Sequence, residues 1–371
     1  MGINRNAVTA LLDRARREVD DGMLPSVQVA LGHEGEIVAE EVFGDATIDT
    51  RYPVFSCTKA FVAAAVWALI GDGLIDVSRR VAEIIPEFAS NGKEGITIEQ
   101  VMLHTAGFPH APMRTLVGST APARRERFAM WRLNWEPGSS FEYHATSAHW
   151  VLADLIERVT GQDFRDVVEQ RVTQPNGLPR VLGIASAQQQ GIATLATIGE
   201  PATAEELRAL LGVDSLPVTE VTADALLAFN DPDQRAVGVP GGGGLMRARD
   251  LALFYQALLH NTAGAWSPAV LADATGHVRS RVPDRYTKVP ANRSLGLVLA
   301  GDDGFSHIRG MGRTVSPRTF GHNGAGGQLA WADPDTGLSL GYCTNGLDQN
   351  VVREARRGTS ISSLAGVCTG P

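Results

Sequence analysis

The chain has 371 residues, of which 44% are hydrophobic and 20% are charged, a composition typical of a globular protein with a sizeable core. Its length suits one large domain or two closely packed domains. A net charge of −8 and a pI near 5.6 argue against a nucleic-acid-binding surface, which requires clustered basic residues.

The predicted elements begin with a helix over residues 6–20, where apolar side chains recur at helical spacing. A β-hairpin follows, with strands over 26–31 and 37–43 that flank a turn at 33–36. An apolar helix then begins at Ser56. Residues 75–235 consist mainly of helical patterns interrupted by proline and glycine loops, so this stretch is predicted to be mostly helical.

After a glycine run at 241–244 the pattern changes again. It predicts a helix over 249–259, strands over 294–300, 328–332 and 337–343, and a last helix over about 349–364. The long loop 301–318, rich in Gly and Arg, is interpreted as a lid or rim. The glycine run matches no phosphate-binding motif, so we interpret it as close backbone packing.

Strand-rich ends that enclose a helical middle predict an α+β fold. We expect an antiparallel β-sheet formed by both termini and flanked by helices, with an inserted, mostly helical domain. The predicted boundaries are 1–74 and 236–371 for the sheet domain and 75–235 for the helical domain, with the active site at their interface. The arginine pairs Arg124 with Arg125 and Arg356 with Arg357 are interpreted as solvated helix faces.

Ser56 and Lys59 are the candidate nucleophile and base. They stand three residues apart at the start of the apolar helix, so their side chains share one face. The helix N-terminus offers free N–H groups and a positive dipole to a developing oxyanion. Burial and that dipole favour the neutral Lys59 amine, the form that a base requires. The pair alone also fits a capping serine and a solvated lysine.

The rarity of lysine strengthens the interpretation of this pair. The chain has 33 basic residues but only three lysines, Lys59, Lys93 and Lys288, and arginine cannot give up its proton to act as a base. The same spacing recurs at Ser90 and Lys93. That copy contains the turn dipeptide Asn-Gly, and no apolar helix follows it, so it is predicted to be a loop.

Further segments, in order along the chain, resemble the β-lactamase-related serine hydrolases: class C β-lactamases, penicillin-binding proteins, D-aminopeptidases and family VIII carboxylesterases. The first contains the S-x-x-K pattern at Ser56. The matching segments are 55–60 (Phe-Ser-Cys-Thr-Lys-Ala), 98–108, 136–143 (Glu-Pro-Gly-Ser-Ser-Phe-Glu-Tyr), 240–254 and 321–327 (Gly-His-Asn-Gly-Ala-Gly-Gly).

This resemblance implies a penicillin-binding-protein fold and an acyl-enzyme on Ser56. It implies that Tyr143 shares proton transfer with Lys59, and that the backbone N–H groups of Ser56 and Ala325 form the oxyanion hole. His104 resembles the buried structural histidine of the family. No metal or organic cofactor is implied.

The third motif is His322-Asn323-Gly324, which the resemblance places at the substrate. β-Lactamases have Lys-Thr-Gly there, and a histidine carries less reliable positive charge at pH 7. A carboxylate-bearing β-lactam is therefore expected to bind less strongly.

A second departure follows Tyr143, where the family usually has an asparagine two residues on. Here that position is Ala145, so β-lactam turnover is in doubt. His144, Ser147 and His149 are the candidates to replace the asparagine, and we include His144 in the predicted substrate-binding set.

The predicted function is a serine hydrolase that cleaves a small-molecule carboxylic ester or an amide. The alternatives left open are an acyltransferase or transesterase, a β-lactamase or D-aminopeptidase, and a catalytically silent binding member of the fold. No nucleic-acid partner is expected, and the oligomeric state stays open.

The predicted location is the cytoplasm. Cys57, Cys343 and Cys368 are an odd number of cysteines without zinc-site spacing, which favours a reducing compartment. The N-terminus lacks the pattern of a signal peptide, and the longest apolar run, residues 60–70, is too short to span a bilayer.

Overall fold

A six-stranded antiparallel sheet contributed by both ends of the chain organises the computed structural model, which describes residues 2–215 and 221–370. The strand order is β2-β1-β9-β8-β7-β6, and every neighbouring pair is antiparallel. The predicted α+β fold with this sheet is confirmed. The strands are β1 (Ser26–His33), β2 (Glu36–Gly44), β6 (Val298–Leu299), β7 (Phe320–Gly321), β8 (Leu329–Asp333) and β9 (Leu338–Thr344).

The predicted hairpins form where the turn chemistry indicated. Glu34 and Gly35, between β1 and β2, both have positive φ, as a tight two-residue hairpin turn requires. β8 and β9 are also an antiparallel pair, joined by the longer turn 334–337.

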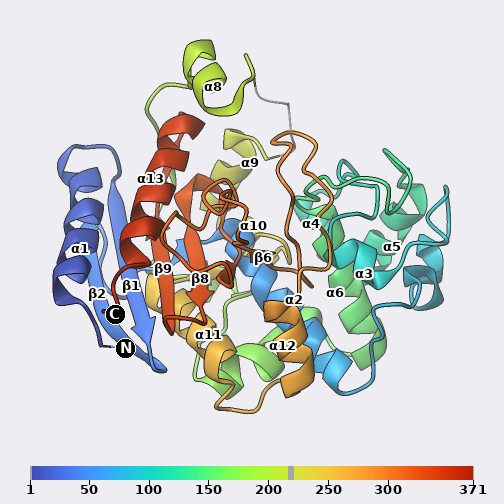
Figure 1. The fold of residues 1–371 in the computed structure, drawn as a ribbon. Helices are drawn as coiled ribbons and strands as arrows, with labels where there is room; N and C mark the ends of the chain where they lie inside the picture. Colours follow the sequence, from blue (N-terminus) through green and yellow to red (C-terminus); the bar gives the residue numbers. More distant parts are fainter. Residues whose placement is uncertain (1, 216–220, 371) are drawn as a thin grey trace.

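Helices cover both faces of the sheet (Figure 1). α1 and α13 pack together on one face, over a core cluster that includes Val27, Val29 and Leu340. α11 packs on the other face so closely that a Cβ on Gly341 of β9 would lie 1.9 Å from the Ala248 carbonyl oxygen. The helices are α1 (Arg5–Asp20), α11 (Ala248–His260), α12 (Pro268–Gly276) and α13 (Val351–Ala365).

The middle of the chain is mostly helical, as expected. Figure 1 shows α3, α5 and α6 on the side of α2 away from the sheet. The two short sheets pair β3 (Tyr52–Pro53) with β5 (Leu245–Met246) and β4 (Ala196–Ile198) with β10 (Gly346–Asp348). The remaining α-helices are α2 (Thr58–Gly71), α3 (Ile98–Met102), α4 (Thr115–Gly118), α5 (Ala121–Met130), α6 (Ser147–Thr160), α7 (Phe164–Val168), α8 (Ala204–Leu211), α9 (Ala223–Leu227) and α10 (Pro232–Ala236).

One hydrophobic core cluster joins the two predicted domains. It contains Phe61 and Trp67 of α2 and Phe254 of α11, together with Phe128 and Val151 from the helical middle. α2 is buried along almost its whole length, which explains its lack of a polar face. The division at residues 74 and 236 stays a prediction.

The expected strand over 294–300 is wrong for most of its length. Only Val298 and Leu299 pair as a strand. Gly296 adopts a positive φ and packs against Ala63 of α2, while the Leu295 carbonyl accepts a hydrogen bond from the Trp67 indole at 2.9 Å. These contacts with α2 bend the segment away from ladder geometry.

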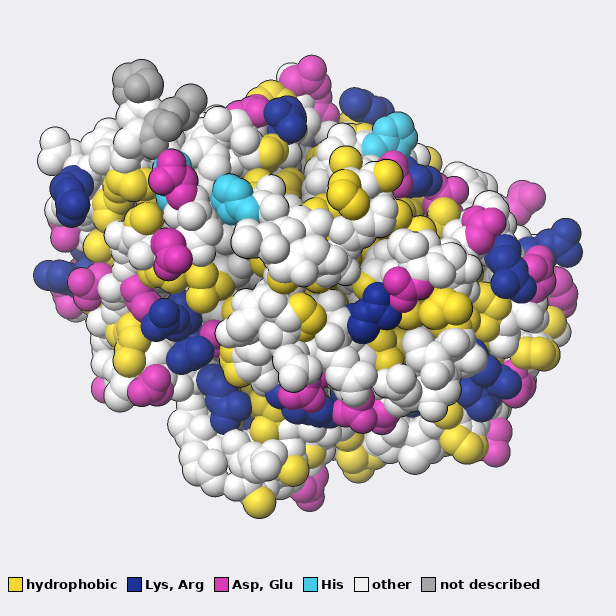
Figure 2. Space-filling view, turned by 90° about the horizontal axis from the view of Figure 1, so that it is seen from below, with side chains coloured by type: hydrophobic (Ala, Val, Ile, Leu, Met, Phe, Trp, Pro, Cys, Tyr) yellow, Lys and Arg dark blue, Asp and Glu magenta, His cyan; other side chains and the backbone are white. Residues whose placement is uncertain are grey.

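The interpretation of the arginine pairs as solvated faces is wrong for one member of each pair, since Arg356 is exposed and Arg125 half-buried but their neighbours are buried. Arg124 is fully buried and forms ion pairs with Asp154 and Glu157 of α6. Arg357 is 2% exposed and pairs with Glu18 and Asp348. Elsewhere the surface is mixed, and Figure 2 shows acidic and basic side chains interspersed over one face. In the described ranges, no helix combines the length and the apolar character that a membrane crossing requires.

Candidate active site

Ser56 lies in a short 3-10 turn, Phe55–Cys57, immediately before α2. The predicted helix start is therefore slightly early, since the α-helix proper begins at Thr58. Phe55 has φ 45°, a left-handed conformation that is uncommon for a residue with a bulky side chain. Such strain next to a reactive group persists only where the surrounding structure enforces it. Cys57 points into the core, where burial raises the pKa of its thiol.

Lys59 is fully buried and reaches Ser56 from the first turn of α2. Its Nζ donates to Ser56 Oγ at 3.2 Å, to the Ala145 carbonyl at 2.7 Å and to the Gly241 carbonyl at 2.6 Å. A Cβ on Gly241 would lie 3.2 Å from this Nζ, so the glycine lets the backbone approach the amine closely. The predicted role of the glycine run in close packing agrees with this contact.

A mainly apolar pocket of about 350 Å³ opens at Ser56. Its walls come from both predicted domains, because Ser56 and Ala325 meet residues of the helical middle there. The apolar part of the lining consists of Phe55, Met113, Ala145, Trp150, Val221, Ala225, Leu226, Phe229, Val239 and Ala325.

The segment 324–327 is held against the Ser56 turn by a close backbone approach. A Cβ on Gly324 would lie 2.2 Å from the Val54 carbonyl oxygen. Ala325 begins the short 3-10 turn Ala325–Gly327 and lines the same pocket as Ser56. Amide N–H groups in the first turn of a helix have no partner within the helix, so both residues carry donors suited to an oxyanion.

Tyr143 is surrounded by buried rings and cations. Lys59 Nζ lies 5.0 Å from its ring centroid, and the Arg293 guanidinium carbon lies 5.4 Å from it on a separate segment. The ring centroids of His104 and His322 are 4.9 and 5.8 Å from that of Tyr143. The structure thus brings Ser56, Lys59, Tyr143 and His322 into one neighbourhood.

The histidines of this neighbourhood are neutral. Burial holds the pKa values of His104, His149 and His322 well below the usual range, and the positive charges of Arg293 and Lys59 lower them further. His322 is therefore no replacement for the charge of a lysine in the third motif at pH 7. The predicted buried position of His104 agrees with the structure.

His144 requires a correction, because it does not line the pocket. Its ring is fully buried, its Nε2 accepts from the Phe108 amide at 3.1 Å, and its Nδ1 lies 2.7 Å from the Glu142 carbonyl. Ser147 donates to the Phe108 carbonyl instead, at 3.0 Å. The Ala145 backbone carbonyl, which binds Lys59, is what this stretch offers to the site.

Asn323 is held by hydrogen bonds between its side chain and the backbone of two other segments. Its amide donates to the Gly310 carbonyl at 2.6 Å and accepts from the Ala330 amide at 3.1 Å. It therefore ties the loop 301–318 to β8, which accounts for the third-motif asparagine without a substrate contact.

Arg293 is the site residue that sequence reasoning missed. It is 9% exposed, and its Nη1 lies 3.5 Å from His322 Nε2. Nothing local distinguishes it from the other arginines of the chain, because its position at the site results entirely from tertiary packing.

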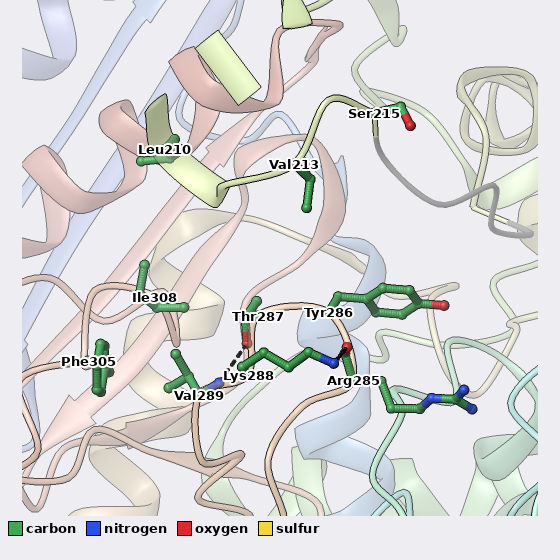
Figure 3. A pocket seen from close by; sticks show the side chains of 10 residues that line it. All are labelled: Leu210, Val213, Ser215, Arg285, Tyr286, Thr287, Lys288, Val289, Phe305 and Ile308. Atoms are coloured by element: carbon green, nitrogen blue, oxygen red, sulfur yellow. Dashed lines mark hydrogen bonds between the residues drawn. The ribbon is translucent and has the colours of Figure 1, made fainter. Parts of the chain in front are cut away.

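A larger cavity of about 620 Å³ lies outside this arrangement (Figure 3). It is formed by residues 285–289, by Phe305 and Ile308, and by the end of α8 with the residues after it. Its link to the site is indirect: the Tyr286 hydroxyl donates to buried Glu142, the neighbour of Tyr143, at 3.0 Å. Across residues 2–215 and 221–370, no three His, Cys, Asp or Glu side chains are arranged to hold a metal ion.

The fold and these segments define a class, the hydrolases built on the β-lactamase and penicillin-binding-protein fold. The chain belongs to the Beta-lactamase family, whose model matches residues 11–362.

Similar proteins carry the names of several activities within that class. The chain is 27% identical over 322 residues to the esterase/beta-lactamase LipL of Mycobacterium tuberculosis. The aligned region covers 81% of this chain and 70% of LipL. A family VIII carboxylesterase structure is 26% identical, with TM-score 0.77 and 98% of each chain covered. A penicillin-binding protein homologue from Caulobacter crescentus has TM-score 0.79 at 23% identity, covering 100% of this chain and 99% of that one, and this likeness concerns the fold alone.

Proposed function

We propose that the protein is a serine hydrolase that cleaves carboxylic esters through an acyl-enzyme on Ser56. The observation that carries this proposal is the position of the Ser56 hydroxyl, which is hydrogen-bonded to a fully buried lysine and opens into a mainly apolar pocket. A nucleophile needs both an activating partner and room for a substrate.

The lysine contacts suggest how the proton moves. A protonated lysine has three N–H donors, which matches the three oxygens that Lys59 contacts. Lys59 then holds Ser56 Oγ in place, and Tyr143, in its phenolate form, takes the hydroxyl proton.

In the acylation step, Ser56 Oγ forms a bond to the ester carbon while the carbonyl π electrons move onto oxygen. The N–H groups of Ser56 and Ala325 stabilise that oxyanion. When the carbonyl re-forms, the alkoxide leaves and accepts the proton from Tyr143. Water then repeats the sequence on the acyl-enzyme, releasing the acid and restoring Ser56.

The pocket supports an ester with an apolar acyl group over a β-lactam. Its walls are aromatic and aliphatic, so they favour hydrocarbon over charged groups. Neutral His322 offers no fixed charge to a β-lactam carboxylate. Ala145 presents only a backbone carbonyl where the family has an asparagine, and that carbonyl binds Lys59.

The test compares Ser56→Ala with Ser90→Ala, the serine of the second S-x-x-K copy. Wild type and Ser90→Ala should react with a fluorophosphonate probe at Ser56 and hydrolyse p-nitrophenyl butyrate, whereas Ser56→Ala should do neither. Nitrocefin should turn over far more slowly than the ester. Labelling or ester hydrolysis that persists in Ser56→Ala would refute the proposal. Product analysis with added methanol distinguishes hydrolysis from acyl transfer.

A further inference from the structure

Arg293 is a buried cation without a salt bridge in the part of the chain that the structure describes. Neighbouring arginines are paired: Arg285 with Glu142, and Arg309 with Asp303. The Arg293 guanidinium instead lies over two aromatic rings, 5.3 Å from the Phe141 centroid and 5.4 Å from that of Tyr143. Its Nε is buried and forms no hydrogen bond with the described residues.

Such a cation is costly to bury unless an anion lies close by. The groups that face it differ in their ability to carry negative charge. The cation beside Tyr143 is Lys59 of α2, and the histidines around the two side chains, His104, His149 and His322, are neutral. Two carboxylates are near: Asp284, whose charge acts on Arg293, and Glu142, which adjoins Tyr143 in the sequence.

Neither carboxylate forms a salt bridge with Arg293, although the charge of Asp284 acts favourably on the guanidinium from beyond salt-bridge distance. Glu142 is bound by His110, Arg285 and Tyr286. Asp284 Oδ1 accepts from the backbone amides of Tyr286 and Thr287, each at 2.8 Å. Of the groups in contact with the guanidinium, Tyr143 is thus the one whose chemistry includes an anionic form.

We propose that Arg293 is the positioning residue that supplies the fixed positive charge on the third-motif side of the site and stabilises the phenolate form of Tyr143. Neutral His322, at 3.5 Å from Nη1, holds the guanidinium in place. This inference rests on the proposed function, because it assigns to Tyr143 the uptake of the Ser56 proton. Arg293 would thus provide, next to His322, the positive charge that the third motif itself lacks.

Removing a positive charge disfavours the deprotonated form of any neighbouring base, so activity requires a higher pH whether Tyr143 or Lys59 takes the proton. A unit charge about 5 Å away, at an effective dielectric constant near 20, moves a titration by somewhat more than two pH units, about 2.4. Arg293→Met should shift the acid limb of the kcat/KM profile upward by that amount.

The experiment measures kcat and KM for neutral p-nitrophenyl butyrate from pH 5.5 to 10 in wild type, Arg293→Met, Arg293→Lys and Arg309→Met. We expect Arg293→Met to lose at least about 100-fold in kcat at pH 7 and to recover at high pH, since displacing the acid limb by two pH units changes the fraction of active enzyme about 100-fold. Arg293→Lys, which keeps the positive charge, should have a pH profile of kcat/KM close to that of the wild type. Arg309→Met, which removes an arginine that is paired with Asp303 and lines a small surface pocket together with Arg293, should leave the acid limb unchanged.

Two further measurements keep the proposal refutable. If Arg293→Met does not fold, the pH profile of kcat/KM for Arg293→Lys decides alone. An acid limb that moves in Arg293→Lys by the full amount expected for loss of the charge contradicts the proposal. Parallel assays use a carboxylate-bearing ester. If Arg293→Met raises KM for that ester only and leaves the limb in place, Arg293 anchors substrate and the proposal is wrong. Absence of probe labelling at wild-type Ser56 would instead refute the proposed function.

Discussion

Substituting Gly324 by alanine tests whether the segment that carries the Ala325 amide must lie close to the Ser56 turn. The backbone at Gly324 has φ −113° and ψ 155°, which any residue adopts, so the added methyl group introduces no conformational strain. It would, however, lie 2.2 Å from the Val54 carbonyl oxygen. Relieving that contact requires the segment carrying Ala325 to move about 1 Å away from the Ser56 turn, a displacement that costs roughly 100-fold in rate.

We therefore expect Gly324→Ala to lower kcat/KM for p-nitrophenyl butyrate by about 100-fold, equivalent to about 2.7 kcal/mol of transition-state stabilisation. Gly95→Ala is the control, because nothing lies within 4 Å of the position that its added methyl group would occupy, and its φ is not in the left-handed region. Thermal unfolding checks that both variants stay folded. A folded Gly324→Ala enzyme with wild-type kcat would refute the oxyanion role of this segment.

Three further predictions concern stability and specificity. Burial raises the pKa of Glu354 to about 7, so the folded state binds extra protons between about pH 4.5 and 7 and loses stability as the pH rises; Glu354→Gln should raise Tm at pH 8 and have no effect at pH 4. Leu226→Trp should narrow the pocket and lower kcat/KM for octanoate esters at least 10-fold relative to acetate esters. Arg124→Met should cost about 3–5 kcal/mol in urea unfolding, because it leaves Glu157 without its cation and removes one of the arginines that pair with buried Asp154, against about 1 kcal/mol or less for Arg125→Met.

The sequence predicted the fold well where local chemistry decides structure. Turn residues and alternating apolar positions located the β1–β2 and β8–β9 hairpins, and helical spacing located α1, α11 and α13. It misjudged positions decided by distant contacts. Residues 294–297 have a strand-like pattern, yet Trp67 and Ala63 of α2 bend them. Arg124 has the pattern of a surface helix, yet α6 covers it.

The same division applies to the site. Ser56 and Lys59 lie one helical turn apart, so their contact follows from local geometry. Tyr143 and His322 could be placed near them only through the resemblance of ordered segments. Arg293 could not be found at all, because its neighbours come from segments far apart in the chain.

The second S-x-x-K copy shows why the serine–lysine contact alone does not define a catalytic site. Lys93 is also fully buried, and its Nζ donates to Ser90 Oγ at 3.0 Å and to the carbonyls of Ser90 and Trp131 at 2.6 and 2.8 Å. Burial lowers the pKa of this lysine to about 8. Judged by these contacts, the two pairs are nearly equivalent.

They differ in what surrounds the hydroxyl. Ser90 Oγ donates its proton to the Ala129 carbonyl at 2.9 Å, which fixes the loop to the end of α5, and Ser90 lines neither the pocket at Ser56 nor the larger cavity. Ser56 instead faces a substrate-sized pocket, beside the Ala325 turn and close to Tyr143. A buried lysine that binds a serine therefore occurs twice in this structure and does not by itself indicate catalysis. The proposal of chemistry at Ser56 depends on the pocket, on the amides of Ser56 and Ala325, and on the Tyr143 phenol.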